Sequence, residues 1–182
     1  MPYDEKRVLK QLADPATRRK AFAEVVQHFG QPLYWKIRHI VLTHEDADDV
    51  LQNTFLKAWS KLDDFQQLSK LSTWLYRIAV NESLDLLRKR KREMEMLTDD
   101  DSHNMADTLM ADTYFDGDAT QLQLQKAIAQ LPSVQRTVFT LRYYDNMKYS
   151  EISQMLDTSE GALKASYHIA VKKITEWMKA NQ

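Results

Sequence analysis

The sequence predicts an all-α fold: two small helical domains joined by an acidic flexible linker. Three observations support this prediction. Gly and Pro, which interrupt helices, number only 3 and 4 in 182 residues. Apolar residues recur at helical spacing in several long stretches. Charge is segregated along the chain. Residues 1–92 hold 17 Lys and Arg against 12 Asp and Glu, and residues 120–182 hold 8 against 5. Residues 93–119, between them, hold 9 Asp and Glu and no Lys or Arg. These three segments are the predicted first domain, linker and second domain.

Composition excludes several kinds of site. The chain has no cysteine, which excludes disulfides, thiolate metal sites and cysteine nucleophiles. Its first twenty residues are charged and lack the apolar core of a secretory signal. The longest apolar runs are too short to span a bilayer. We therefore expect a cytoplasmic protein.

The first domain is expected to contain three or four helices. An apolar stripe indicates the first long helix, with a bend expected near Gly30 and Pro32. The stripe consists of Phe22, Val25, Val26, Phe29, Leu33, Ile37 and Ile40. The next stretch, "THEDADDVLQNTFLKAWSKL", should begin a helix at Thr43 or His44, because a hydroxyl can cap it and acids in the first turn suit the helix dipole. Its apolar face is supplied largely by Val50, Phe55, Ala58 and Trp59.

A polar loop or short helix, "DDFQQLSKLS", then leads into the long helix "STWLYRIAVNESLDLLRKRKR" at residues 72–92. One half of this helix is apolar, formed by Leu75, Tyr76, Ala79, Val80, Leu84, Leu86 and Leu87. The opposite face holds Trp74, Arg77, Asn81, Asp85, Arg88 and Arg92. An aromatic ring among cationic groups suits base stacking and phosphate binding. Alternatively, Trp74 packs on another helix and the basic run is a solvated helix end.

The second domain is predicted to contain four helices, with breaks near Pro132, near Asn146 and at residues 157–158. The last two have the length and spacing of a helix-turn-helix. In the first of these, residues 149–156, Ile152 and Leu156 should point inward, and Thr158 should cap the second helix, from residue 159 to about 178. The inward stripe of the second helix is Leu163, Tyr167, Ala170, Ile174 and Met178. An ordinary helical hairpin remains the alternative.

Two stretches of the sequence resemble two regions of the same protein family. The stretch "DADDVLQNTFLKAWSKLDDF", followed by the helix at 72–92, closely resembles region 2 of extracytoplasmic-function (ECF) bacterial RNA polymerase sigma factors. The stretch "LPSVQRTVFTLRYYDNMKYSEISQMLDTSEGALKASYHIAVKKI" resembles their region 4. The resemblance covers about residues 20–92 and 122–178. It implies a factor that performs no bond chemistry, needs no cofactor, and binds core RNA polymerase and promoter DNA. It also implies a dedicated anti-sigma partner.

The resemblance also implies roles for individual residues. Contacts with core polymerase fall on Asp46, Asp48, Asp49, Gln52, Phe55, Leu56 and Trp59, although Phe55 and Trp59 could instead serve mainly the core. The loop at residues 66–71 matches the one that captures a base flipped out of the −10 element. Other −10 contacts fall on Ser69, Lys70, Trp74, Arg77, Asn81, Asp85, Arg88 and Arg92. Contacts with the −35 element fall on Ser159, Glu160, Gly161, Lys164, Ala165, His168 and Lys172.

Several positions depart from the family pattern. Arginine is common at three positions of the family's recognition helix, where this chain has Ser166, Ile169 and Val171. Ala162 and Ala165 stand where Thr and Ser are common. Asn53 replaces a common acidic residue, and Asp157 replaces a common turn glycine. Fewer cationic contacts put the affinity and sequence preference for the −35 element in doubt.

Two other classes of protein compete with a sigma factor. One is a stand-alone helix-turn-helix regulator, which would not need the region 2-like helices. The other is a metal-dependent nuclease using Asp46, Asp48 and Asp49, or the linker acids at 99–101 with His103. No second ligand cluster, Gly-rich phosphate loop or nucleophile motif accompanies these acids, and the five histidines lack ligand spacing. We therefore expect no metal site and no catalytic residue.

Overall fold

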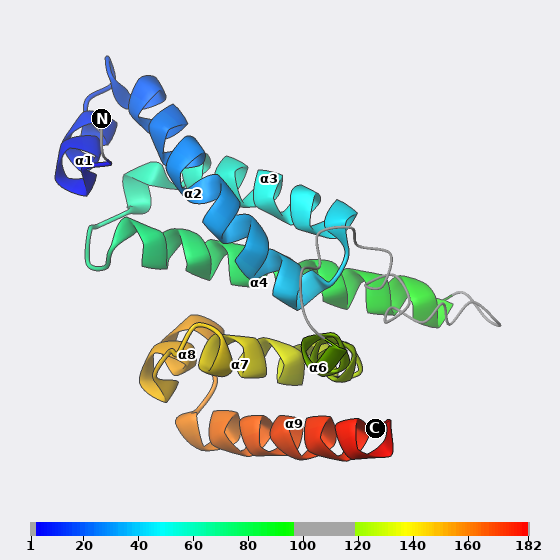
Figure 1. Cartoon of the computed structure of the whole chain (residues 1–182). Helices are drawn as coiled ribbons and strands as arrows, with labels where there is room; N and C mark the ends of the chain where they lie inside the picture. Colours follow the sequence, from blue (N-terminus) through cyan, green and yellow to red (C-terminus); the bar gives the residue numbers. More distant parts are fainter. Residues whose placement is uncertain (1–2, 97–118, 182) are drawn as a thin grey trace. The chain divides into compact units, whose positions relative to one another are not determined.

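The computed structural model describes residues 3–96 and 119–181, in which all regular secondary structure is helical (Figure 1). The predicted all-α class is confirmed. The chain divides into two compact units, Met1–Leu86 and Leu87–Gln182. Within the described ranges, no helix has the length and apolar character needed to cross a membrane. Most of the predicted linker, residues 97–118, lies outside the described residues, and the predicted domain boundaries stay a prediction.

The first unit contains α1 (Glu5–Ala13), α2 (Arg18–Val41), α3 (His44–Ser60), a 3-10 turn η1 (Leu62–Asp64) and most of α4 (Leu71–Met96). Helix α2 continues through Gly30 and Pro32. Thr43 caps α3, as predicted, by accepting a hydrogen bond from the backbone N–H of Asp46 at 3.2 Å. Helix α4 extends to Met96, four residues past the predicted end at residue 92.

The core of the first unit forms where the apolar faces of α2, α3 and α4 meet. Its buried side chains include Val25, Leu33, Ile37 and Ile40 of α2, Val50 and Ala58 of α3, and Leu75, Ala79, Val80 and Leu84 of α4. Two residues assigned to apolar faces differ from the prediction, because Val26 is 37% exposed and Trp59 is 42% exposed. Both lie beside Leu56 at the edge of the α2–α3 contact, where no described residue covers them fully.

The second unit contains α6 (Ala119–Ala129), α7 (Ser133–Tyr143), α8 (Tyr149–Leu156) and α9 (Glu160–Ala180). The predicted breaks are confirmed: Pro132 precedes α7, while Asn146 and Asp157 adopt left-handed backbone angles with φ of 50°. Its core includes Ala127, Ile128, Leu131, Phe139, Ala170 and Ile174.

Two details of the helix-turn-helix differ from the prediction. Ser159 caps α9, accepting from the N–H of Ala162 at 3.3 Å, whereas the hydroxyl of Thr158 donates to the carbonyl of Leu156 at 3.1 Å. In α8 the residue buried with Ile152 is Met155, because the inward side follows the i, i+3 spacing and leaves Leu156 half-buried.

A buried cation closes the end of α6. Arg136 is 3% exposed, and its guanidinium donates to the carbonyls of Leu131 at 3.0 Å and Ala129 at 3.4 Å. Ala129 is the last residue of α6, and Leu131 lies two residues beyond it. Carbonyl groups at the C-terminus of a helix have no N–H partner within the helix, so the guanidinium supplies the missing donors. Burial disfavours the charged form and lowers the pKa of Arg136 to about 10.

Candidate functional site

An apolar groove of about 640 Å³ runs between α2 and α3. Its lining residues are Arg19, Phe22, Ala23, Val26, Gln52, Phe55, Leu56 and Trp59. Leu56 is 62% exposed, and it lies in the groove with the partly exposed Val26 and Trp59. Exposed apolar area gathered in a groove indicates an interaction surface.

The sequence predicts the α3 side of this groove but not its α2 side. Gln52, Phe55, Leu56 and Trp59 were predicted to contact a partner, and the structure brings them together. The α2 contribution was missed, because Phe22 and Val26 belong to an apolar stripe that also supplies the core. Phe22 packs edge-on against Trp59, with ring centroids 5.0 Å apart, so the aromatic side of the groove is preformed.

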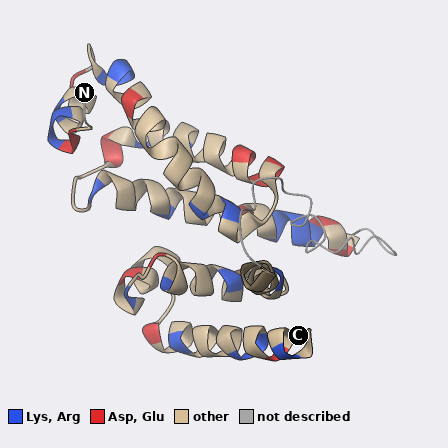
Figure 2. Ribbon diagram, in the orientation of Figure 1, with Lys and Arg blue, Asp and Glu red and all other residues tan. Residues whose placement is uncertain are grey.

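The first turns of α3 are acidic (Figure 2), and their carboxylates are divided between surface and core. Asp48 and Asp49 are exposed, and Asp48 lies 3.2 Å from the Nε2 atom of His44. The Nδ1 atom of His44 is 2.7 Å from the hydroxyl of Tyr34. Asp46 is completely buried, unlike the other two acids. The structure therefore corrects its placement: its carboxylate is not available for direct contact with a partner in this conformation.

The predicted polar face of α4 is confirmed as a surface. The side chains of Arg77, Asn81, Asp85, Arg88 and Arg92 are all exposed on it. Figure 2 shows basic residues gathered toward the end of this helix. Lys89 and Lys91 lie 3.9 and 3.8 Å from Glu93 and Glu95, one helical turn on. Such exposed pairs are weak, so they leave the cations available to phosphates.

Trp74 and the loop before α4 lie close together. Trp74 is half-buried, and its ring lies 4.9 Å from that of Phe65, centroid to centroid. Trp74 thus packs on Phe65, the residue that follows η1, and also remains partly exposed, while its role in base stacking stays a prediction. The loop side chains at residues 66–70 are exposed, with Leu68 89% exposed. Gln67 adopts a left-handed φ of 55°, which side-chain-bearing residues rarely do.

The outward face of α9 also matches the prediction in its exposure. Its exposed residues include Ser159, Glu160, Gly161, Lys164, Ala165, His168 and Lys172. A Cβ added at Gly161 would meet no atom within 4 Å, so packing within the chain does not require this glycine. Ile169 and Val171, at two positions where the family often has arginine, are 43% and 38% exposed. This face therefore carries apolar surface as well as cations.

The nuclease alternative finds no support in the described residues. Among residues 3–96 and 119–181, no group of three or more His, Asp or Glu side chains could hold a metal ion. Asp46 and Asp49 share a helix side by spacing, but one is buried and the other is exposed. The candidate ligands at 99–101 and at His103 lie outside the described residues.

Comparison with known proteins agrees with this arrangement. The family model for sigma-70 region 2 matches residues 25–93, and the model for sigma-70 region 4 matches residues 121–174. The ECF RNA polymerase sigma factor SigW of Bacillus subtilis (strain 168) is 31% identical over 81% of this chain and 83% of its own length. RNA polymerase sigma factor NccH of Alcaligenes xylosoxydans xylosoxydans is 27% identical over 89% of both chains.

The solved structure of sigma factor RpoE with the anti-sigma factor NepR from Bartonella quintana has a similar fold. Its TM-score is 0.66 at 24% identity, covering 90% of this chain and 99% of that one. Two helical units with these matches define a transcription initiation factor of the sigma-70 class. More narrowly, the chain belongs to the ECF family of RNA polymerase sigma factors, and it directs promoter-specific transcription initiation. The stand-alone regulator has no support, since the region 2 match covers the helices that such a protein would not need.

Proposed function

We propose that this sigma factor binds core RNA polymerase, the −10 element and the −35 element through three separate surfaces. The α2–α3 groove and the acidic start of α3 bind core RNA polymerase. The polar face of α4, with the loop at residues 65–70, binds the −10 element, and the outward face of α9 binds the −35 element. The protein itself makes and breaks no bonds and works in the cytoplasm, where core polymerase is found.

The observation that carries the polymerase assignment is the exposed apolar groove. Leu56, Trp59 and Val26 expose apolar area that residues 3–96 and 119–181 leave uncovered. Aromatic and aliphatic side chains in a groove are typical anchors of a protein interface, while charges at the rim steer association. Asp48 and Asp49 supply such a rim and favour a basic surface on the partner.

The proposed −10 surface combines an aromatic ring with cations on one face of α4. Trp74 is partly exposed beside Phe65, so a base that leaves the duplex can stack at this place. Arg77, Arg88 and Arg92 on the same face neutralise phosphates. Binding unstacked bases offsets part of the free energy needed to open the DNA, which is a few kcal/mol for each flipped base.

For the −35 element, α9 is the second helix of the helix-turn-helix and presents small residues between cations. Gly161 and Ala165 permit close approach to the major groove, and Lys164 and Lys172 reach phosphates. Lys164 and Lys172 each lie 3.9 Å from a glutamate one turn away, and such exposed pairs are weak, so both cations remain available to phosphates.

We also propose that an anti-sigma protein restrains this chain. Sigma factor RpoE of Bartonella quintana is solved with the anti-sigma factor NepR, and CnrH is solved with the cytosolic domain of CnrY. An apolar groove that binds polymerase is a natural surface for a competing protein, because covering it blocks holoenzyme formation.

Leu56→Ser tests the polymerase surface. Leu56 is largely exposed, so serine removes apolar contact area with little effect on folding. We expect affinity for core polymerase, measured by fluorescence anisotropy, to fall about tenfold or more, as for an interface anchor. Trp35→Ala is the matched control, since Trp35 is 39% exposed on α2 and does not line the groove. Unchanged affinity of the Leu56→Ser protein would remove the groove from the polymerase interface.

A further inference from the structure

The start of α4 lacks a cap from its own segment. The first N–H groups of any helix have no intrahelical acceptor and are usually satisfied by the side chain just before the helix. Here that residue is Lys70, whose ammonium group cannot accept a hydrogen bond. Leu71, the first residue of α4, is 1% exposed, so water is poorly placed to serve its N–H.

The missing acceptor comes from the other end of the unit. The N–H of Leu71 donates to the carboxylate of Glu5, at the first residue of α1, over 3.0 Å. A carboxylate at a helix N-terminus is also favoured by the helix dipole. Glu5 therefore caps α4 across 66 residues of sequence, immediately after the loop at residues 65–70.

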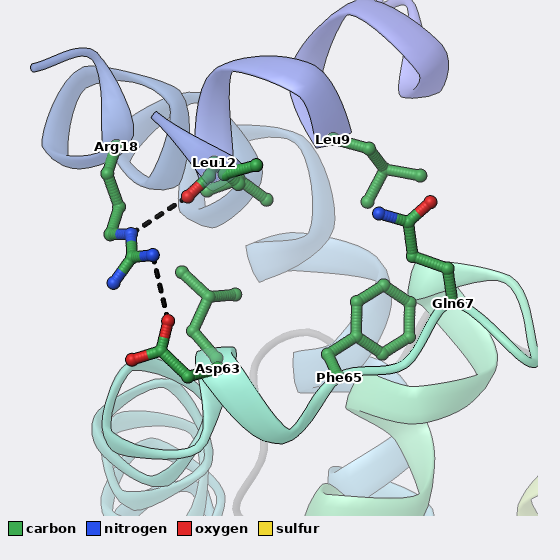
Figure 3. Close-up of a pocket in the computed structure, with 8 residues that line it drawn as sticks. Leu9, Leu12, Arg18, Asp63, Phe65 and Gln67 are labelled. Atoms are coloured by element: carbon green, nitrogen blue, oxygen red, sulfur yellow. Dashed lines mark hydrogen bonds and ion pairs between the residues drawn. The ribbon is translucent and has the colours of Figure 1, made fainter. Parts of the chain in front are cut away.

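A second polar contact holds the other end of this loop. Arg18, at the start of α2, pairs with Asp63 of η1 at 2.8 Å and donates from Nε to the carbonyl of Leu12, also at 2.8 Å (Figure 3). The side chain of Asp63 is 77% exposed, so this pair is the weaker of the two anchors.

Between the two anchors, packing leaves a gap. A pocket of about 270 Å³ separates α1 from the segment after α3, and Figure 3 shows Leu9 on one side with Phe65 and Gln67 on the other. Apolar contact with α1 is thus incomplete along the loop. Gln67 nevertheless adopts its left-handed conformation there, and such a conformation persists only where the surroundings impose it. The two anchored ends are the contacts placed to impose it.

We propose that Glu5 is a positioning residue for single-stranded −10 DNA. By capping α4 from α1, it fixes the loop at residues 65–70 and the neighbouring Trp74 in the arrangement that receives an unstacked base. This role rests on the proposed function of the loop. Residues 5–18, which provide both anchors, lie outside the part of the chain matched by the region 2 model. Helix α1 therefore contributes to binding of the −10 strand, although the region 2 model does not include it.

The test uses the full-length protein with core polymerase. A random-sequence duplex pool, selected with the wild-type holoenzyme, provides a promoter, and 2-aminopurine placed along its non-template −10 strand reports base unstacking. We expect Glu5→Ala to lower affinity for this single strand about tenfold, as for loss of a charge-assisted hydrogen bond to a buried N–H, with affinity for core polymerase unchanged. Asp63→Ala should give a smaller loss, and Glu5→Gln, which keeps an acceptor oxygen, an intermediate one.

Glu24→Gln is the matched control. It weakens the ion pair between Arg7 of α1 and Glu24 of α2 and leaves the carboxylate of Glu5 that caps α4 in place. We expect it to leave affinity for the −10 strand within about twofold of wild type, as for an exposed pair. Thermal unfolding of each variant identifies any general loss of stability.

Three results would overturn the role of Glu5. One is wild-type affinity for the −10 strand in the Glu5→Ala protein. Another is an equal loss of affinity for polymerase and for the −10 strand, which would show a merely structural role. The third is the same loss in the Glu24→Gln protein. A wild-type protein that binds polymerase but no −10 strand would instead contradict the proposed function of the loop.

Discussion

Single residues with the same chemistry have different environments in this protein. Asp46 and Asp48 are two positions apart on α3, which places them on opposite sides of the helix. Asp46 is buried, and Asp48 is exposed beside His44. The sequence shows that the start of α3 is acidic, but the side that faces inward depends on which helices pack against it. Among the three acids, we therefore propose polymerase contact only for Asp48 and Asp49.

Ile169 offers a test of the proposed contact between α9 and DNA. It is 43% exposed at a position where the family often has arginine. Ile169→Arg should tighten binding of the holoenzyme to a promoter duplex and steepen the dependence of log affinity on log salt by about 0.9, the value for one added phosphate contact. Ile169→Gln, which adds polarity without charge, should leave the slope unchanged. An unchanged slope in the arginine variant would place residue 169 away from the phosphates.

Tyr3 makes the docking of α1 sensitive to high pH. Its ring stacks on His28 with centroids 3.8 Å apart, and burial, together with Glu5 and Glu24, raises its pKa to about 12. Because the folded pKa exceeds the unfolded value of 10.0, the stabilisation is full below pH 10 and is lost as pH rises toward 12. Urea unfolding at about pH 8 and about pH 11 should show a smaller loss of stability for Tyr3→Phe than for wild type. Equal losses would mean that Tyr3 ionises normally.

Helix boundaries in this protein follow the local sequence closely, whereas contacts between distant segments do not. Helix α8 begins and ends where predicted, because Asn146 and Asp157 adopt left-handed turns at its flanks. The capping of α4 by Glu5 has no local signal, since its partners are 66 residues apart. The groove shows a similar limit, because an apolar stripe does not separate Val25 in the core from Val26 at the surface.

The start of α9 tests the assignment of its cap. Ser159 accepts from the N–H of Ala162, and Thr158 bonds to a carbonyl behind it instead. Ser159→Ala should therefore lower the free energy of unfolding by about 1 kcal/mol, the usual cost of losing an N-cap. Thr158→Ala should cost only a few tenths of a kcal/mol, as for most surface changes. Urea denaturation monitored by circular dichroism distinguishes the two, and a reversed order would make Thr158 the cap.

Across the two units, the three proposed surfaces use separate side chains. The groove is lined by α2 and α3, whereas the proposed −10 residues lie on α4 and the loop before it. Polymerase and −10 DNA therefore need not compete for the same residues. The proposed −35 surface belongs to α9, in the other unit. This division predicts that changes at one surface reduce one binding step and leave the others intact.

The most direct test of this division is run-off transcription with core RNA polymerase and the selected promoter. Wild-type protein should join core and yield a defined transcript. The double change Asp48→Ala and Asp49→Ala should prevent joining and abolish the transcript, while free protein keeps its affinity for duplex DNA. If the double variant instead joins core and transcribes like wild type, Asp48 and Asp49 do not bind polymerase. If wild-type protein binds duplex DNA but gives no transcript with core, the protein does not act as a sigma factor.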